Sequence, residues 1–134
     1  MLLPTGATVA VVDGRTLILF RNTGKEGTPK LQPLSPGAVD GDHEGSGGGH
    51  RSSAANPDDR TVEEDGFAVG VADLLNREAL DGNIDELVVI APPRTLGELR
   101  KHYHRRLSAV LMGEIGKELA GRSVADIEQA IVAA

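Results

Sequence analysis

Residues 86–103 read ELVVIAPPRTLGELRKHY, and this stretch decides the fold class. Leu87 to Ala91 is a continuous apolar run, which is typical of a central strand covered on both faces. Pro92-Pro93 ends that strand, and the spacing of Thr95 and Glu98 predicts a capping box at the start of a helix. Apolar residues then repeat at helical spacing and predict one helix, whose stripe is Leu96, Leu99, Tyr103 and Leu107.

Before this block, the chain begins with a pattern of strands. Residues 7–13 and 16–21 are rich in β-branched and apolar residues, and Asp13-Gly14 lies between them. An Asp-Gly pair predicts a β-hairpin with a type I′ turn, in which both central residues have positive φ. A turn over 22–28 and a short strand over 30–34 follow, and Pro33 predicts that this third strand lies at an edge.

The middle of the chain has a different composition. Residues 35–59 show no periodicity, and residues 41–49 contain five glycines. Such a segment buries too little apolar surface to offset its ordering entropy, so we expect a mobile loop that is either functional or disordered. Helical spacing returns after Thr61, and Gly82 predicts the end of that helix.

The last part of the chain is less uniform. Residues 109–119 fit a helix in some positions and a strand in others, and the pattern alone does not decide between them. Ser123 and Asp126 predict the start of a final helix. The expected order is β-β-β-loop-α-β-α-(β)-α, an α/β fold with a mixed sheet in a single domain over residues 1–134.

Composition excludes several classes of function. The 134 residues include no cysteine, which excludes disulfides, thiolate metal sites and a cysteine nucleophile. Only three residues are Phe, Tyr or Trp, so an aromatic base-stacking platform is not expected. Residues 35–66 carry eight acidic and two basic side chains, which equals the whole net charge of −6. No apolar run is long enough to cross a membrane, and we expect a cytoplasmic protein.

Four stretches carry a resemblance to a known family: VVDG near the start, SGGGHR at 46–51, the acidic run that follows, and APPRTLGELR at 91–100. Together they resemble the bacterial host-attachment protein family, which is similar to the middle domain of archaeal and eukaryotic class I peptide-chain release factors. The resemblance implies a ribonuclease-H-like fold in which residues 109–119 are mostly strand. It also implies an indirect role in attachment to host cells.

The release-factor domain carries a GGQ loop whose glutamine orients water at a peptidyl-tRNA ester. In this chain the corresponding loop reads Gly47, Gly48, Gly49, His50 and Arg51, and the glutamine is absent. The glycines still allow a close approach of the backbone to a ligand. We therefore do not predict a peptidyl-tRNA hydrolase.

A cluster of cations follows the central strand: Arg94, Arg100, Lys101, Arg105 and Arg106, with His102 and His104 among them. These residues indicate either a phosphate-binding or RNA-binding patch, or a solvated helix face. Arg94 and Thr95 also lie where a strand ends and a helix begins, a place that suits an anion. The alternative is that Arg94 pairs with an acidic neighbour and fixes the turn.

Other chemistry has weaker support. Asp42, His43, Glu44 and His50 are metal-ligating types without a standard spacing. Asp13 suggests the leading acid of a ribonuclease-H-type nuclease, but matched second and third carboxylates are not evident. The sequence also contains neither a nucleophile elbow nor a P-loop pattern.

These observations predict a non-catalytic cytoplasmic module that binds the ribosome, tRNA or other RNA, or a protein, and needs no cofactor. The alternative is a hydrolase of an RNA or ester bond that acts through Gly47–Arg51. We expect the site to lie between Arg94 and that loop.

Overall fold

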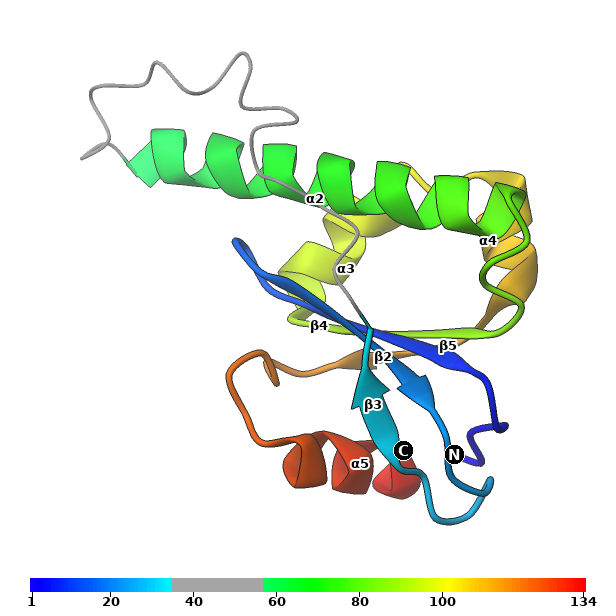
Figure 1. Ribbon diagram of the computed structural model, residues 1–134. Coiled ribbons are helices and arrows are strands. Elements are labelled where there is room, and N and C mark those ends of the chain that lie inside the picture. Colours follow the sequence, from blue (N-terminus) through cyan, green and yellow to red (C-terminus); the bar gives the residue numbers. More distant parts are fainter. Residues whose placement is uncertain (35–56) are drawn as a thin grey trace.

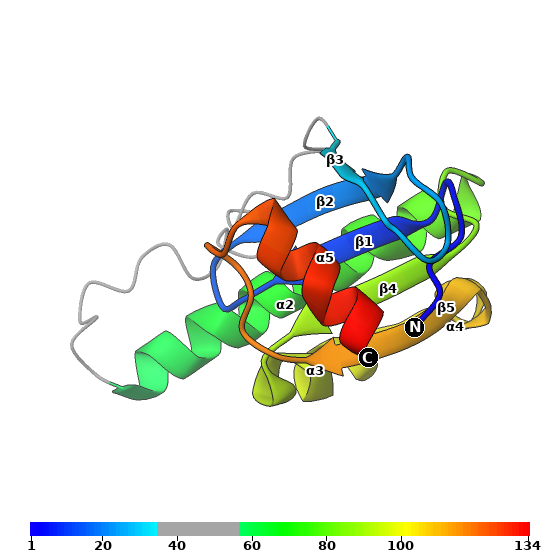
Figure 2. The same cartoon turned by 90° about the horizontal axis from the view of Figure 1, so that it is seen from below.

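The computed structural model describes residues 1–34 and 57–134, except for the side chains of residues 57–61, and contains one five-stranded mixed sheet. The strand order is β3-β2-β1-β4-β5, with β4 parallel to both β1 and β5. Helices α2, α3 and α4 cover one face and α5 covers the other (Figures 1 and 2). The elements are β1 (Thr8–Val12), β2 (Leu17–Asn22), β3 (Leu31–Pro33), α2 (Pro57–Leu80), β4 (Leu87–Ala91), α3 (Pro93–Arg100), α4 (Arg105–Val110), β5 (Leu111–Gly116) and α5 (Val124–Ala133). The predicted α/β fold with a mixed sheet is confirmed.

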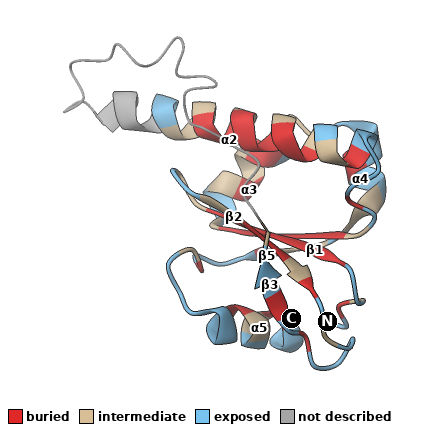
Figure 3. Cartoon of the chain, in the orientation of Figure 1, coloured by how far each residue is buried: buried red, intermediate tan, exposed pale blue. Residues whose placement is uncertain are grey.

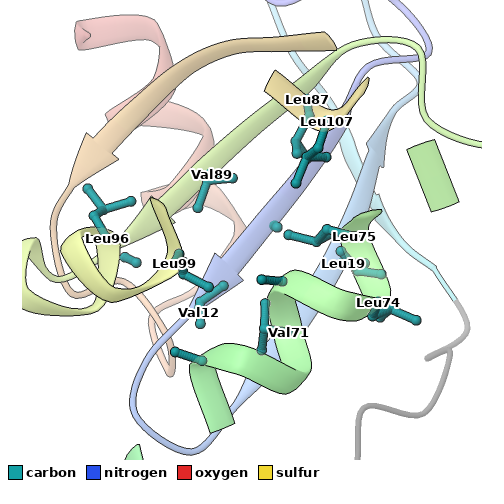
Figure 4. Close-up of a cluster of buried hydrophobic side chains, with 14 of the residues drawn as sticks. Val12, Leu19, Val71, Leu74, Leu75, Leu87, Val89, Leu96, Leu99 and Leu107 are labelled. Atoms are coloured by element: carbon teal, nitrogen blue, oxygen red, sulfur yellow. The ribbon is translucent and has the colours of Figure 1, made fainter. Parts of the chain in front are cut away.

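The core has two layers that share the sheet. Every residue of β1 and β4 is buried (Figure 3), which confirms the prediction of a central strand over the ELVVIA stretch. Val89 faces the α2, α3 and α4 layer (Figure 4), whereas Val88 and Ile90 face α5. Since both faces of β4 are covered, its continuous apolar run is explained by its position in the sheet.

The β1–β2 hairpin is confirmed, but its predicted turn type is wrong. Neither Asp13 nor Gly14 has positive φ. Asp13 Oδ1 accepts hydrogen bonds from the backbone N–H of Arg15 (2.7 Å) and of Thr16 (2.6 Å), so the carboxylate itself organises the turn. A Cβ at Gly14 would lie 2.7 Å from Cδ of Glu64 on α2, so a side chain at this position would require the flexible Glu64 side chain to move.

Helix α2 begins at Pro57, inside the predicted loop of residues 35–59 and before the predicted start at Thr61. Proline is favoured at the first position of a helix, because its missing N–H has no partner there. The first turns of α2 extend beyond the sheet (Figure 1), so no apolar periodicity marks them in the sequence. Gly82 has φ of 80° just past the helix, as predicted. The rest of the predicted loop lies outside the described residues.

Two predictions for residues 93–110 are wrong. The helix begins at Pro93, and its N-cap, Pro92, makes no side-chain capping bond. Thr95 is therefore already inside the first turn, and Glu98 instead accepts a hydrogen bond from Nζ of Lys101 at 3.0 Å. The predicted single helix is two helices, α3 and α4, which are separated by residues 101–104.

The last predictions are confirmed. Residues 111–116 form β5, parallel to β4, so residues 109–119 are mostly strand as the resemblance implied. Ser123 Oγ accepts a hydrogen bond from the backbone N–H of Asp126 at 3.1 Å and caps α5. Within residues 1–34 and 57–134, no helix combines the length and the apolar character that a membrane span requires.

Candidate functional site

Most of the predicted site cations gather at one turn of the structure. We define the basic turn as residues 100–106, which read RKHYHRR and include the end of α3, the connection to α4 and the first two residues of α4. It lies beside α2, toward the end of the molecule that is remote from the projecting first turns of α2 (Figure 1). His102 and Tyr103 are half-buried, and the other five residues are exposed.

Arg100 is held by a carboxylate on β5. Its Nε lies 2.9 Å from Oε1 of Glu114, and a terminal guanidinium nitrogen lies 2.8 Å from the same oxygen. Tyr103 donates from its hydroxyl to Oε2 of Glu114 at 3.4 Å. Burial, and then the charge of Glu114, raises the pKa of Tyr103, and the bond to Glu114 raises the pKa of Arg100. Glu114 therefore ties the basic turn to the sheet and offsets one of its charges.

Glu98 offsets a second cation. Lys101 Nζ lies 3.0 Å from Oε1 of Glu98, and Nε2 of His102 lies 3.6 Å from Oε2. The hydrogen bond from Lys101 lowers the pKa of Glu98, and His102 lowers the same pKa by a smaller amount. Since the Lys101 side chain is 67% exposed, the pair reduces the local charge without fixing the turn strongly.

Arg105 and Arg106 differ from the other cations of the turn. Both are exposed, and within residues 1–34 and 57–134 neither side chain has an ion pair or hydrogen bond. Their backbone is nevertheless ordered, because Nδ1 of His104 accepts a hydrogen bond from the N–H of Arg106 at 2.9 Å and caps α4. The basic turn has four cationic side chains and two carboxylate partners, so it carries a local excess of two positive charges. The net charge of the whole chain is −6.

Arg94 and Thr95 lie at the other end of α3, about 9 Å from Arg100 at the rise of an α-helix. Arg94 lies 3.3 Å from Oδ1 of Asp65 on α2, so the pairing considered as its alternative role is present. The strand order reverses between β1 and β4, and Arg94 follows the carboxyl end of β4 at that switch point. Arg94 remains 56% exposed and keeps donors free for a ligand.

The structure does not place the loop half of the predicted site. Gly47, Gly48, Gly49, His50 and Arg51 lie outside the described residues, and so do the metal-ligand candidates Asp42, His43 and Glu44. The predicted site between Arg94 and the loop therefore stays a prediction. In the described part of the chain, no group of three or more His, Asp or Glu side chains could hold a metal ion.

Two residues that organise the basic turn were missed by the sequence analysis, Glu114 and Asn76. Asn76 lies on α2 at four residues from Ala72 and three from Ala79, both of them buried. A polar residue within an apolar stripe is a signal of a specific hydrogen bond, so Asn76 could have been found. Glu114 had no such signal, because residues 109–119 were ambiguous until the strand was placed.

The family model described as bacterial archaeo-eukaryotic release factor family 12 matches residues 6–131, nearly the whole chain. No curated protein matches the sequence.

Proposed function

The chain belongs to family 12 of the bacterial archaeo-eukaryotic release factors, and on that premise we propose that it is a non-catalytic module that binds RNA, free or in the ribosome, through the phosphate backbone. The family match confirms the release-factor part of the resemblance. The surface that binds RNA in this proposal is the basic turn, with Arg105 and Arg106 as its main contacts and Lys101 beside them.

The observation that carries the proposal is the pair of unpartnered arginines. Arginine presents a planar fork of donors that matches phosphate oxygens, and an exposed guanidinium without a carboxylate partner is free to use it. Arg105 and Arg106 are consecutive and follow a capped helix start, so their backbone direction is fixed while their side chains reach outward. Two contacts to neighbouring phosphates are consistent with this arrangement.

The aromatic residues support contact with phosphates rather than with bases. The chain has two phenylalanines and one tyrosine, and Phe20 and Phe67 are buried in the core. Tyr103 is half-buried and bonded to Glu114, so its ring is not presented as a stacking surface. Binding should therefore depend little on RNA sequence and strongly on salt concentration.

The uneven charge of the chain supports a single orientation of the RNA. The net charge of −6 equals that of residues 35–66, so this acidic segment repels a polyanion whereas the basic turn attracts it. The two free arginines would therefore orient the RNA as well as contribute to affinity.

The experiment measures binding of a fluorescent structured RNA by anisotropy over a series of salt concentrations. The test variant is Arg105→Glu/Arg106→Glu, and the control is Lys25→Glu/Arg122→Glu, which changes the net charge equally at two exposed cations away from the turn. The test variant should bind at least about tenfold more weakly at low salt and lose about 1.4 to 1.8 units of salt slope, the amount expected for two phosphate contacts. The control should change affinity much less.

Equal weakening of both double variants would contradict the proposal, because it would show a general charge effect. If the parent protein binds no RNA at low salt, a protein partner becomes the better hypothesis. Arg94 and Thr95 are proposed as a second, weaker contact at the far end of α3. Arg94→Ala should therefore weaken RNA binding more than Arg122→Ala does.

The hydrolase alternative and the indirect role in attachment to host cells stay predictions. The hydrolase depends on Gly47–Arg51, which lies outside the described residues, and no described residue favours it. His50→Ala tests it directly, because a loop that performs the reaction should lose activity on an RNA or ester substrate with that change.

A further inference from the structure

Asn76 of α2 holds the connection between α3 and α4 by two hydrogen bonds. Its Nδ2 donates to the carbonyl of His102 at 2.9 Å, and its Oδ1 accepts from the backbone N–H of His104 at 2.8 Å. The two backbone groups flank Tyr103, so the side-chain amide pairs with the main chain as the peptide group of a neighbouring strand would. Asn76 is half-buried and 26 residues away from His102 in the sequence.

This contact acts at the place where the helix could otherwise continue or fray. The N–H groups of Lys101 and His102 still bond to the carbonyls of Glu98 and Leu99, as at the end of a helix. The N–H of His104 has turned away to Asn76, and the ring of His104 then caps α4 through the N–H of Arg106. The direction in which α4 leaves the turn is thus set by Asn76 followed by His104.

The same turn is anchored on its other side by Tyr103 and Arg100, which both bond to Glu114 on β5. Those anchors act on side chains, whereas Asn76 alone, within residues 1–34 and 57–134, binds the backbone of the turn from another element. Removing it would leave the backbone of residues 102–104 with more conformational freedom, while the side chains of Tyr103 and Arg100 keep their partner.

We propose that Asn76 is a positioning residue of the RNA-binding surface: it orders the basic turn in the free protein, so that Arg105 and Arg106 meet RNA already in place. This proposal rests on the proposed function. A surface that is ordered in advance does not lose backbone entropy on binding, and this raises affinity without adding a contact. In this proposal Asn76 acts on RNA through the turn, since one N–H and the oxygen of its amide already bond to the backbone there.

A positioning role and a contact role predict different salt behaviour. The salt slope counts the phosphates that are neutralised, so it falls by roughly 0.7 to 0.9 for each lost contact. Loss of Asn76 leaves every cation in the chain, and Arg105 and Arg106 can still reach phosphates after paying the cost of ordering. Asn76→Ala should therefore weaken RNA binding by about threefold to tenfold at every salt concentration, with the slope unchanged.

The experiment compares the parent protein with Asn76→Ala and with Asn83→Ala as a matched control. Asn83 lies just after the end of α2 and likewise uses its side-chain amide in a hydrogen bond, from Nδ2 to Glu78, but it does not bind the basic turn. RNA affinity and salt slope are measured by anisotropy at a temperature at which circular dichroism shows all three proteins folded. Amide hydrogen exchange of His104 in the absence of RNA reports the order of the turn directly.

We expect fast exchange of the His104 amide and weaker RNA binding in Asn76→Ala, and parent-like behaviour in Asn83→Ala. Asn76→Asp, which has the same size and keeps the acceptor for His104, should retain slow exchange of that amide. If the alanine variant does not fold, Asn76→Leu, which has nearly the same shape as asparagine and no hydrogen-bonding group, replaces it in the comparison with Asn83→Ala and should show fast exchange of the His104 amide and weaker binding with the same slope.

The outcomes separate this inference from the proposed function. A parent protein that binds no RNA refutes the proposed function, and the inference falls with it. A parent that binds RNA while Asn76→Ala binds equally well, or exchanges the His104 amide as slowly, refutes the inference alone. A decrease of the salt slope in Asn76→Ala also refutes it, since that result assigns Asn76 to a direct contact.

Discussion

The replacement Val89→Ala tests the position of β4 at the centre of the sheet. Val89 is fully buried and faces the layer formed by α2, α3 and α4, near Leu99 and Leu96 (Figure 4). The change removes two methyl groups, which are worth about 1.6 kcal/mol at ~0.8 kcal/mol for each buried carbon. The strand ladders to Ala10 of β1 and Glu114 of β5 hold the backbone on both sides, so the site cannot collapse to fill the space.

The cavity adds to the transfer cost, and we expect the free energy of unfolding to fall by about 2 to 3 kcal/mol. For a domain of this length that loss corresponds to a decrease in Tm of about 7 to 10 °C. Urea unfolding followed by circular dichroism measures it: the midpoint should decrease while the m-value stays constant. The control is Val132→Ala on α5, whose side chain is 51% exposed, and it should change stability by less than about 0.5 kcal/mol.

A loss below about 0.5 kcal/mol for Val89→Ala would refute the reasoning, because it would place the residue at an edge or a surface. Val88→Ala extends the test to the other face of the same strand, where Val88 packs in the α5 layer. Both replacements should be costly if β4 is covered on both faces. A large effect at only one of them would mean that one of the two layers does not pack on the sheet.

Three further predictions concern single interactions. Tyr103 is the only tyrosine and the chain has no tryptophan, so the near-ultraviolet absorbance of phenolate reports Tyr103 alone. Because burial and Glu114 raise the pKa of Tyr103 above the ordinary 10.0, its contribution to the free energy of unfolding is complete below pH 10 and is lost as the pH rises through the folded-state pKa. Half-ionisation of Tyr103 at pH 10 in the folded protein would contradict this prediction. Ser123→Ala removes the cap of α5 and should cost about 1 kcal/mol in urea unfolding, whereas Ser123→Asp should retain most of it. Arg94→Ala breaks an exposed ion pair with Asp65 and should change stability by less than about 1 kcal/mol, so a larger loss would show that the pair supports the fold.

The strands of the sheet were largely predictable from the sequence. Residues 87–91 are apolar at every position, and a strand needs that pattern only where both of its faces are covered. The β1–β2 hairpin and the start of α5 were also predictable, because Asp13-Gly14 and Ser123 act on residues within three positions of themselves. Interactions between residues this close together in the sequence can be predicted without knowledge of the rest of the fold.

The candidate site was predictable in part. The cations at Arg100, Lys101, Arg105 and Arg106 were found from the sequence, but the carboxylates that pair with two of them were not: Glu114 pairs with Arg100 and Glu98 with Lys101. Glu114 comes from the neighbouring strand, so its role depends on the pairing of β4 with β5. Which cations stay free for a ligand is therefore a property of the tertiary structure.

The sequence by itself determined the central strand, the hairpin, the last helix and the presence of a cationic segment, because each depends on near neighbours in the chain. Tertiary structure decided that residues 93–110 form two helices, that residues 111–116 pair as a strand, and which arginines lack a partner. The helical stripe that ends at Leu107 is equally compatible with one helix or two, and at the break Asn76 reaches the backbone of the turn from α2. A hydrogen bond between elements far apart in sequence produces no periodic pattern in the segment that it joins. It forms only when the two elements have packed together, so the residues near the turn do not predict it.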